Sequence, residues 1–442
     1  MIYKDFQDML LKIALEKGCT AAEVYAIDTD KFFVEVMEGE VDSYSVSQSV
    51  SLALRVTVNG CDGYAYTMLL DEPEDLVMQA MKNANACQPG ESKPMQPKSM
   101  YSVVEQTETP LANMTTAERI AFVTETEKQV RTADERYLRV AENQIKVVHS
   151  TTHIANTLGL CASRQAVYAQ CSVEPVLQKG TQMQKGRAVR CGKDIFDVKQ
   201  YAKDAVSDAA RKFDATTVPS GEYPVILEKH AASALLNGFF SVFSASRAQK
   251  GMSLLRGKEG EQIAASCISI TDDPFLAFNP RPFDDEGVPS VCTTVIENGI
   301  LKSLLYDMES AHKAGRVSTS NGGRESAMSA VEIKPSNFYI LPGKSTYDQL
   351  MEHMGDGLII RDLSGLHVGM DPVSGDFSLL AGGWLRKDGE LQPVEQITVA
   401  GNFFKMLLET EEVGDDLHLG VPRTAVVGSP SLRIKKLMIS GC

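Results

Sequence analysis

The order of predicted elements repeats in the first half of the chain, and this repeat is the strongest constraint on the fold. An apolar period of about 3.6 residues over Tyr3–Lys17 predicts a helix, which is followed by strand-like runs and by a helix from Asp71 to Ala86. A second copy starts with a helix over Thr115–Arg131 and ends with a helix over Asp197–Phe213. Each copy is a helix–sheet–helix module. The repeat fits either an ancient duplication or two unrelated α+β modules.

Strands within the modules are indicated by alternating apolar and polar residues. In the clearest run, Val50–Val58, every second residue is valine or leucine, and the run ends in Asn59-Gly60, a pair typical of a type I′ hairpin turn. Helix starts are indicated by Asp71 with Glu74 and by Thr115 with Glu118, two capping patterns. The other strand-like runs are 23–28, 32–37, 137–148, 159–173 and 183–191.

The second half of the chain, from Val218, differs in composition and pattern: it contains more glycine, and its predicted strands are short and separated by loops. It predicts strands at 223–227, 337–341, 377–386, 394–399 and 432–439, with helices at 231–245 and 402–409. We therefore predict an α+β protein in which two N-terminal helix–sheet–helix modules precede a large β-rich α+β C-terminal domain. The expected boundaries are 1–87, a proline-containing linker at 88–114 that crosses the surface without regular structure, 115–215 and 218–442.

Charge and cysteine content exclude several classes of function. A net charge of -14 opposes loose binding to nucleic acid or to an acidic membrane. No uninterrupted apolar run approaches the ~18 residues of a membrane span, and the N-terminus lacks the pattern of a signal peptide. Nine cysteines without a Cys-x-x-Cys pair are typical of reduced thiols. We expect a cytoplasmic protein that binds neither nucleic acid nor membranes.

An acidic segment between Ser269 and Gly323 is the main candidate for chemistry. Like charges repel and a buried unpaired carboxylate is costly, so such density is typical of a functional surface. The carboxylates could act as acid and base, bind a hard cation or bind amines and backbone N–H groups; a solvated acidic loop is the alternative. Five of its carboxylates crowd into fifteen turn-rich residues: Asp272, Asp273, Asp284, Asp285 and Glu286.

Other candidate sites are weaker. His149 and His153 have a spacing that would place both rings on one helix face, but the surrounding residues indicate a strand edge and no third metal ligand lies nearby. No Gly-x-Ser-x-Gly motif is present. Cys267 and Cys292 lie in apolar strand-like runs, where we expect core thiols.

Several ordered motifs follow one another in the second half of the chain, at 270–274, 284–289, 296–299, 320–326, 401–402 and 429–441. They resemble the C-terminal domain of the TldD/PmbA family, whose members are also called modulators of DNA gyrase, and the resemblance covers nearly the whole chain. The resemblance implies a two-subunit peptidase that removes leader segments and degrades unfolded polypeptide. Its TldD-like subunit carries a His-Glu-x-x-x-His helix that binds zinc together with a C-terminal cysteine.

The chain departs from the family's zinc pattern. Where the motif would fall, the sequence reads Asn237-Gly238-Phe239-Phe240-Ser241-Val242, and His230 lies upstream without a glutamate after it. The position expected for the thiolate falls near Gly414–Leu417, which contains no cysteine. The resemblance therefore implies a member of the PmbA branch, also called TldE. We expect no metal, no cofactor and no catalytic residue in this chain, with zinc in its partner.

The predicted function is that of the non-metal subunit of a metallopeptidase, so whether this chain is itself an enzyme stays open. It would pair with a TldD-like paralogue, or with itself when expressed alone, and act on peptides. The alternatives are a self-sufficient hydrolase and a non-proteolytic regulator of gyrase or of a toxin–antitoxin partner. By carry-over of the family's motifs, the candidates for lining the peptide cleft are Asp272, Asp273, Asp284, Asp285, Glu286 and Asn321.

Overall fold

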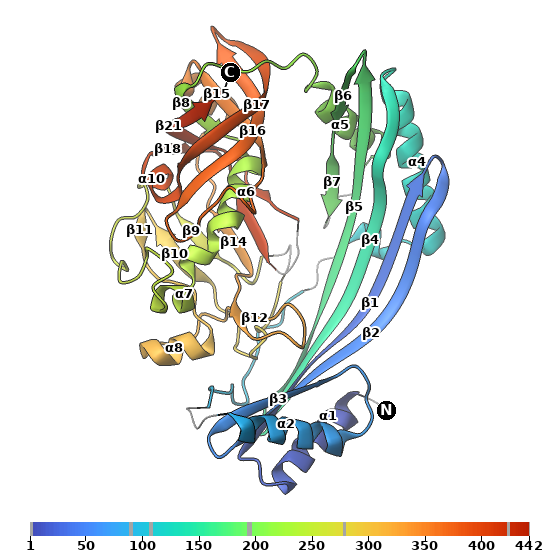
Figure 1. The fold of residues 1–442 in the computed structure, drawn as a ribbon, viewed down its shortest axis with the longest axis vertical. Coiled ribbons are helices and arrows are strands. Elements are labelled where there is room, and N and C mark those ends of the chain that lie inside the picture. Colours follow the sequence, from blue (N-terminus) through green and yellow to red (C-terminus); the bar gives the residue numbers. More distant parts are fainter. Residues whose placement is uncertain are drawn as a thin grey trace.

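The computed structural model describes residues 3–87, 92–105, 109–191, 197–276, 280–421 and 425–441. It confirms the predicted α+β class, with helices and strands interleaved along the chain. Figure 1 shows two bodies side by side: a long curved sheet built by the first half, and a C-terminal body of shorter strands. Among the described helices, none is both long and apolar enough to cross a bilayer.

One seven-stranded sheet contains the strands of both predicted N-terminal modules. Its order is β3-β2-β1-β4-β5-β6, with β7 also paired to β5. β1 pairs antiparallel with β4 from Glu23↔Asn156 to Glu35↔Gln144, so the two modules are joined through their central strands. The strands are β1 (Ala21–Met37), β2 (Glu40–Val58), β3 (Cys61–Thr67), β4 (Tyr137–Asn156), β5 (Cys161–Lys179), β6 (Gln182–Lys185) and β7 (Ala188–Cys191).

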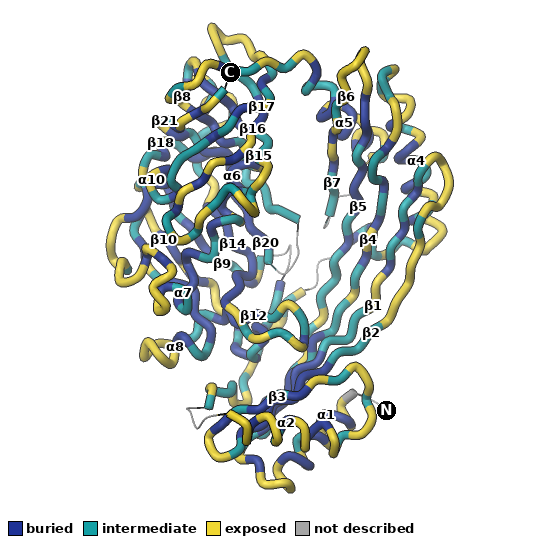
Figure 2. Tube along the Cα trace, in the orientation of Figure 1, coloured by how far each residue is buried: buried dark blue, intermediate teal, exposed yellow. Residues whose placement is uncertain are grey.

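Each end of this sheet has its own helical layer and its own core. α1 (Tyr3–Glu16) and α2 (Pro73–Ala86) cover one end, where Val24 of β1 belongs to the buried cluster. α4 (Thr116–Ala133) and α5 (Val198–Ala210) cover the other end, where Val34 of the same strand is buried. The predicted strands 23–28 and 32–37 are therefore one strand, because a single long strand serves both cores. Figure 2 shows the two buried zones along the sheet.

Three local sequence signals, one for a turn and two for helix starts, can be compared with the structure. Two of them are confirmed and one is wrong. Asn59 and Gly60 both have positive φ, 51° and 77°, as a type I′ turn requires. Thr115 and Glu118 form the predicted capping box. By contrast, α2 begins at Pro73 with Glu72 at its N-cap, not at Asp71. Proline suits the first helical position because it has no N–H to leave unsatisfied there, and this moves the helix start.

The predicted linker is only partly described. Residues 88–91 and 106–108 of this prediction lie outside the described residues. Residues 92–105 contain no helix or strand, whereas α3 (Pro110–Asn113) forms a short helix at the end of the predicted linker.

The C-terminal body is built from two six-stranded sheets and a β12–β13 pair. The first has the order β17-β16-β15-β8-β21-β18, and an additional β17–β21 pairing closes five of its strands into a ring; the second has the order β11-β10-β9-β14-β20-β19. The strands are β8 (Gly221–Leu227), β9 (Ile270–Asp272), β10 (Thr293–Glu297), β11 (Ile300–Leu301), β12 (Gly322–Gly323), β13 (Glu332–Ile333), β14 (Asn337–Ile340), β15 (Gly357–Ser364), β16 (Asp376–Lys387), β17 (Glu390–Asn402), β18 (Thr410–Val413), β19 (His418–Leu419), β20 (Val426–Ser429) and β21 (Leu432–Ser440).

The apolar helix predicted over 231–245 is interrupted. α6 (Lys229–Phe239) passes into the 3₁₀ turn η1 (Phe240–Phe243), and Ser244 then caps the separate helix α7 (Ala245–Gln249) by accepting from the Arg247 N–H. Serine favours caps over helix interiors because its hydroxyl competes for backbone groups, which explains the break. The other helices of this body are α8 (Met308–Ala314), α9 (Tyr347–Met354) and α10 (Phe403–Leu408).

Candidate functional site

The acidic segment lies at the junction between the N-terminal sheet and the C-terminal body. Asp285 is its central residue. Its Oδ1 accepts from the Tyr25 hydroxyl of β1 at 2.8 Å and pairs with Arg164 Nη2 of β5 at 2.5 Å, while Oδ2 accepts from the Arg324 N–H at 2.8 Å. Burial would raise the pKa of Asp285, but Arg164, the Arg324 N–H and the Tyr25 hydroxyl lower it below its ordinary value. Asp285 is therefore an ionised clamp between the two bodies.

Asp284 shapes the turn beside this clamp. Its Oδ1 accepts from the N–H groups of Glu286 and Val288 at 2.9 and 3.0 Å, and its Oδ2 accepts from the Gly322 N–H at 2.8 Å. Burial raises its pKa to about 6, although Arg281 and these N–H groups favour the ionised form. Gly287 follows with φ +77°, and a Cβ there would lie 2.6 Å from Leu160 Cδ2, so glycine is favoured at this position.

Asp272 and Asn321 form a second buried pair. Asn321 Nδ2 donates to Asp272 Oδ2 at 2.7 Å, and Ser336 donates its N–H and hydroxyl to Oδ1 at 2.8 and 3.0 Å. Asp273 lies apart from this pair and accepts from the Phe275 N–H at 2.9 Å. The carboxylates of Asp272, Asp284 and Asp285 thus already accept from donors of this chain, and the peptide-lining role of all six candidates stays a prediction.

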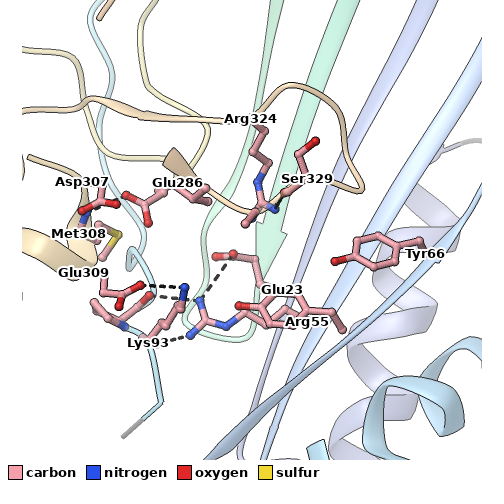
Figure 3. Close-up of a pocket in the computed structure, with 14 residues that line it drawn as sticks. Glu23, Arg55, Tyr66, Lys93, Glu286, Asp307, Met308, Glu309, Arg324 and Ser329 are labelled. Atoms are coloured by element: carbon pink, nitrogen blue, oxygen red, sulfur yellow. Dashed lines mark hydrogen bonds and ion pairs between the residues drawn. The ribbon is translucent and has the colours of Figure 1, made fainter. Parts of the chain in front are cut away.

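Glu286 differs from its neighbours because it borders a cavity. Its Oε2 accepts from the Met308 N–H at 2.8 Å, and burial together with Asp284 raises its pKa well above the ordinary value. The cavity, of about 170 Å³, lies between the two bodies. Figure 3 shows Glu286 and Arg324 on one side, and Glu23 and Arg55 of the sheet with Lys93 on the other.

A larger groove of about 1410 Å³ adjoins this cavity and shares Lys93, Asp307 and Glu309 with it. Most of its lining comes from α6, η1, α7 and α8 and from residues 330–335, 418–421 and 425–427. Sequence reasoning missed this groove because its lining residues are scattered from Lys93 to Val427 and no local spacing connects them.

Comparison with known proteins gives the family. Family models of the PmbA/TldA metallopeptidase match domain 1 at residues 22–84, the central domain at 109–213 and the C-terminal domain at 220–441. The chain belongs to the PmbA/TldD family.

Some individual relatives match along nearly their whole length. A metalloprotease TldD homolog of Haemophilus influenzae is 26% identical, over 99% of this chain and 93% of the relative. A solved structure from Thermotoga maritima, a candidate modulator of a DNA gyrase, has a TM-score of 0.90 at 27% identity and covers 99% of this chain and 100% of its own. TldE of Thermococcus kodakarensis shares the fold, with a TM-score of 0.89 at 24% identity, 99% of this chain and 100% of its own.

In this PmbA/TldD-family chain, α6 forms one wall of the groove. It contributes His230, Ser233, Ala234 and Asn237 to the lining. The opposite face of the helix is apolar: Phe239 is fully buried and stacks on Phe403 with ring centroids 4.6 Å apart. The helix therefore serves the core with one face and offers the groove short polar side chains with the other.

Two histidines meet at the end of this wall. The His230 and His418 rings lie 4.2 Å apart between centroids, and both residues line the groove. Partial burial is the main cause that lowers the pKa of His230, and electrostatic interactions with His418, Arg361 and Lys229 lower it further. Burial is also the main cause that lowers the pKa of His418, with a smaller contribution from Lys229. Both rings are therefore neutral at physiological pH.

The other sequence candidates do not converge. His149 and His153 lie in β4, where four residues span about 13 Å, too far for one metal ion. Within the described residues, no group of three or more His, Cys, Asp or Glu side chains could hold a metal. The prediction of core thiols was wrong: Cys267 and Cys292 are exposed, because Cys267 lies in a turn and Cys292 just before β10.

Proposed function

We propose that this chain is the non-metal, PmbA/TldE-like subunit of a cytosolic peptidase and acts with a zinc-bearing TldD-like paralogue on leader peptides and unfolded polypeptides. The observation that carries the proposal is the composition of α6 in the groove wall. Where the family resemblance places a His-Glu-x-x-x-His motif, this chain has Asn237–Val242. A catalytic zinc needs three protein ligands and an open position, and these residues supply neither imidazole nor thiolate.

The core contacts of this segment support the same proposal. Phe239, Val242 and Phe243 are fully buried, and the aromatic contacts of Phe239 and Phe243 tie the segment to Phe403. Replacing such residues with histidine would bury a polar ring or open a cavity in the core. Val242, the last residue of the Asn237–Val242 segment, thus serves the core, whereas Asn237 at its start lines the groove.

The size of the groove supports a polypeptide ligand. Its volume of about 1410 Å³ exceeds the roughly 300–1,000 Å³ typical of small-molecule sites. An extended peptide can also add its backbone to an exposed strand edge, a mode of binding that tolerates many sequences. In the proposed assembly this subunit shapes the chamber and its partner supplies the metal; a homodimer is expected when the chain is expressed alone.

Co-expression with a His-Glu-x-x-x-His paralogue from the same genome tests the proposal. We expect a stable complex that contains zinc and cleaves a leader peptide, whereas the isolated chain does neither. A control complex, in which the motif glutamate of the paralogue is changed to glutamine, should assemble but not cleave. Cleavage and bound zinc in the isolated chain would instead support a self-sufficient hydrolase. Absence of both complex and cleavage would support a non-proteolytic regulator.

A further inference from the structure

The groove carries more positive than negative charge, although the whole chain has a net charge of -14. Six cationic side chains line it against four carboxylates. The cations are Lys93, Arg187, Arg247, Lys250, Lys313 and Lys334, and the carboxylates are Asp307, Glu309, Glu325 and Glu332. A cationic lining in an acidic molecule is a local feature that the overall composition does not explain.

Four of the six cations are already paired within the chain. Lys93 and Lys313 contact Glu309 at 2.7 and 2.5 Å, and their hydrogen bonds lower the pKa of Glu309 to about 2. The remaining pairs are Arg187 with Glu174, at 3.2 Å, and Lys334 with Glu325. These four cations share three carboxylates, so each is held in an ion pair of the chain itself.

Arg247 and Lys250 differ from the other four. Within the described chain, neither side chain makes an ion pair or a hydrogen bond, and Arg247 Nε is buried without an acceptor. A buried N–H group that lacks an acceptor destabilises the free protein, so a ligand that supplies an acceptor relieves that cost. Arg247 therefore has a buried donor without an acceptor, and Lys250 is an exposed cation without an ion-pair partner in the described chain.

The backbone that carries these cations is fixed. Ser244 caps α7 through the Arg247 N–H, and Gln249 Nε2 donates to the Ser310 carbonyl of α8 at 2.8 Å. The Met252 N–H donates to the Arg247 carbonyl at 2.8 Å and orders the chain just beyond Lys250. A fixed backbone lowers the entropy lost when these side chains engage a ligand.

We propose that Arg247 and Lys250 bind the side-chain carboxylates of acidic peptides in this groove, so that the subunit selects acidic segments of its substrates. The planar guanidinium matches a carboxylate in a bidentate hydrogen-bonded pair, and Lys250 adds a second charge nearby. Two free cations favour a segment with several carboxylates over a single terminal one. The inference rests on the proposed peptide-binding function and adds its substrate class.

Fluorescence anisotropy with the full chain tests this selection. Three labelled 12-residue peptides would differ only in carrying glutamate, glutamine or lysine at alternate positions, each with an amidated C-terminus. The glutamate peptide should bind at least about tenfold more tightly than the glutamine peptide, since charge-assisted hydrogen bonds are about twice as strong as neutral ones. Its affinity should fall as NaCl is raised, because salt screens exposed charges.

A matched pair of double variants locates the binding charges. Arg247→Gln with Lys250→Gln should weaken binding of the glutamate peptide by about tenfold and abolish its advantage over the glutamine peptide. Arg256→Gln with Lys258→Gln removes the same charges from exposed positions of the same body that do not line the groove. This control should leave the affinity nearly unchanged. Thermal unfolding of both variants checks that they are folded.

Three results would overturn the inference. They are equal binding of the glutamate and glutamine peptides, equal losses in the two double variants, or no binding of the acidic peptide, whose C-terminus is amidated. Cleavage by the zinc-bearing complex separates this failure from that of the proposed function. A complex that cleaves glutamate and glutamine peptides equally contradicts the inference alone, whereas failure to form or to cleave contradicts the proposed function.

Discussion

Two charged regions of this molecule lie next to each other and use their charges differently. At the junction, Asp285 is buried between Tyr25, Arg164 and the Arg324 N–H, so that both of its oxygens are occupied. In the groove, Arg247 and Lys250 have no partner among the described residues. The difference teaches that dense charge in a sequence does not identify a ligand site. The charges that remain unpaired after folding are the better candidates.

The largest loss of stability is expected when the Asp285 clamp at the junction is removed. Asp285→Ala leaves Arg164, whose side chain is only 14% exposed, without its partner. Loss of one member of a buried pair destabilises a protein by about 3–5 kcal/mol. Chemical denaturation should show a loss of this size, whereas Asp273→Ala, in the same segment, should cost no more than about 1 kcal/mol. Equal losses would show that Asp285 is not a clamp.

A second change tests the close contact between the two bodies. Gly287→Ala would place a Cβ 2.6 Å from Leu160 at a residue with φ +77°, so we expect a loss of about 1–3 kcal/mol. Gly365→Ala is the matched control, because Gly365 has φ +80° and a methyl group added there would meet nothing within 4 Å. It isolates the cost of the left-handed conformation. If both variants lose the same stability in a denaturation experiment, steric contact at the junction contributes nothing.

Glu286 should make the junction sensitive to pH. Its pKa is higher in the folded chain, so the folded state binds more protons, and its contribution to stability falls as pH rises above the ordinary value of 4.5. Asp285 has the opposite sign: its lowered pKa adds stability above 3.8 that is lost as pH falls through the folded value.

Glu286→Gln should therefore stabilise the chain more at pH 8 than at pH 5, by about 1 kcal/mol or more, because one pKa unit corresponds to about 1.4 kcal/mol. Denaturation at the two pH values measures this. An identical pH dependence in the variant and the original chain would mean that Glu286 is not protonated preferentially in the folded state.

How much the sequence could predict depends on whether a signal is local. Alternation over Val50–Val58 and the Thr115–Glu118 box identify a strand and a helix start because neighbouring residues determine both. The pairing of β1 with β4 joins residues far apart in sequence, and an alternating pattern does not name its partner strand. Residue spacing therefore suggested two modules but could not reveal their shared sheet.

The same limit applies to the candidate site. Acidic density drew attention to Asp284, Asp285 and Glu286, which lie at the junction, and their role in lining a peptide cleft stays a prediction. It could not show that Tyr25 and Arg164 would contact the Asp285 carboxylate, since both lie on strands that are distant in sequence. Nor could the sequence single out Arg247, because what distinguishes this residue is a buried Nε–H group without an acceptor in the described chain.

The smallest effect on stability is expected in the groove. Arg247→Gln removes a guanidinium that has no partner in the described chain, so the free energy of unfolding should fall by no more than about 0.5 kcal/mol, and loss of the unsatisfied N–H group favours a small gain. Together with the loss caused by Asp285→Ala, this would separate a structural charge from a ligand-binding one. A loss of several kcal/mol at Arg247 would place it in the first class and contradict the comparison.

The zinc content of the purified chain, alone and in complex with its zinc-bearing paralogue, tests the central claim most directly. Elemental analysis should find essentially no zinc in the isolated chain and about one ion per complex, because in the proposed assembly the paralogue supplies the protein ligands. Peptide cleavage should be detected only in the sample that contains zinc. One tightly bound zinc ion per isolated chain, together with cleavage by that chain, would contradict the account.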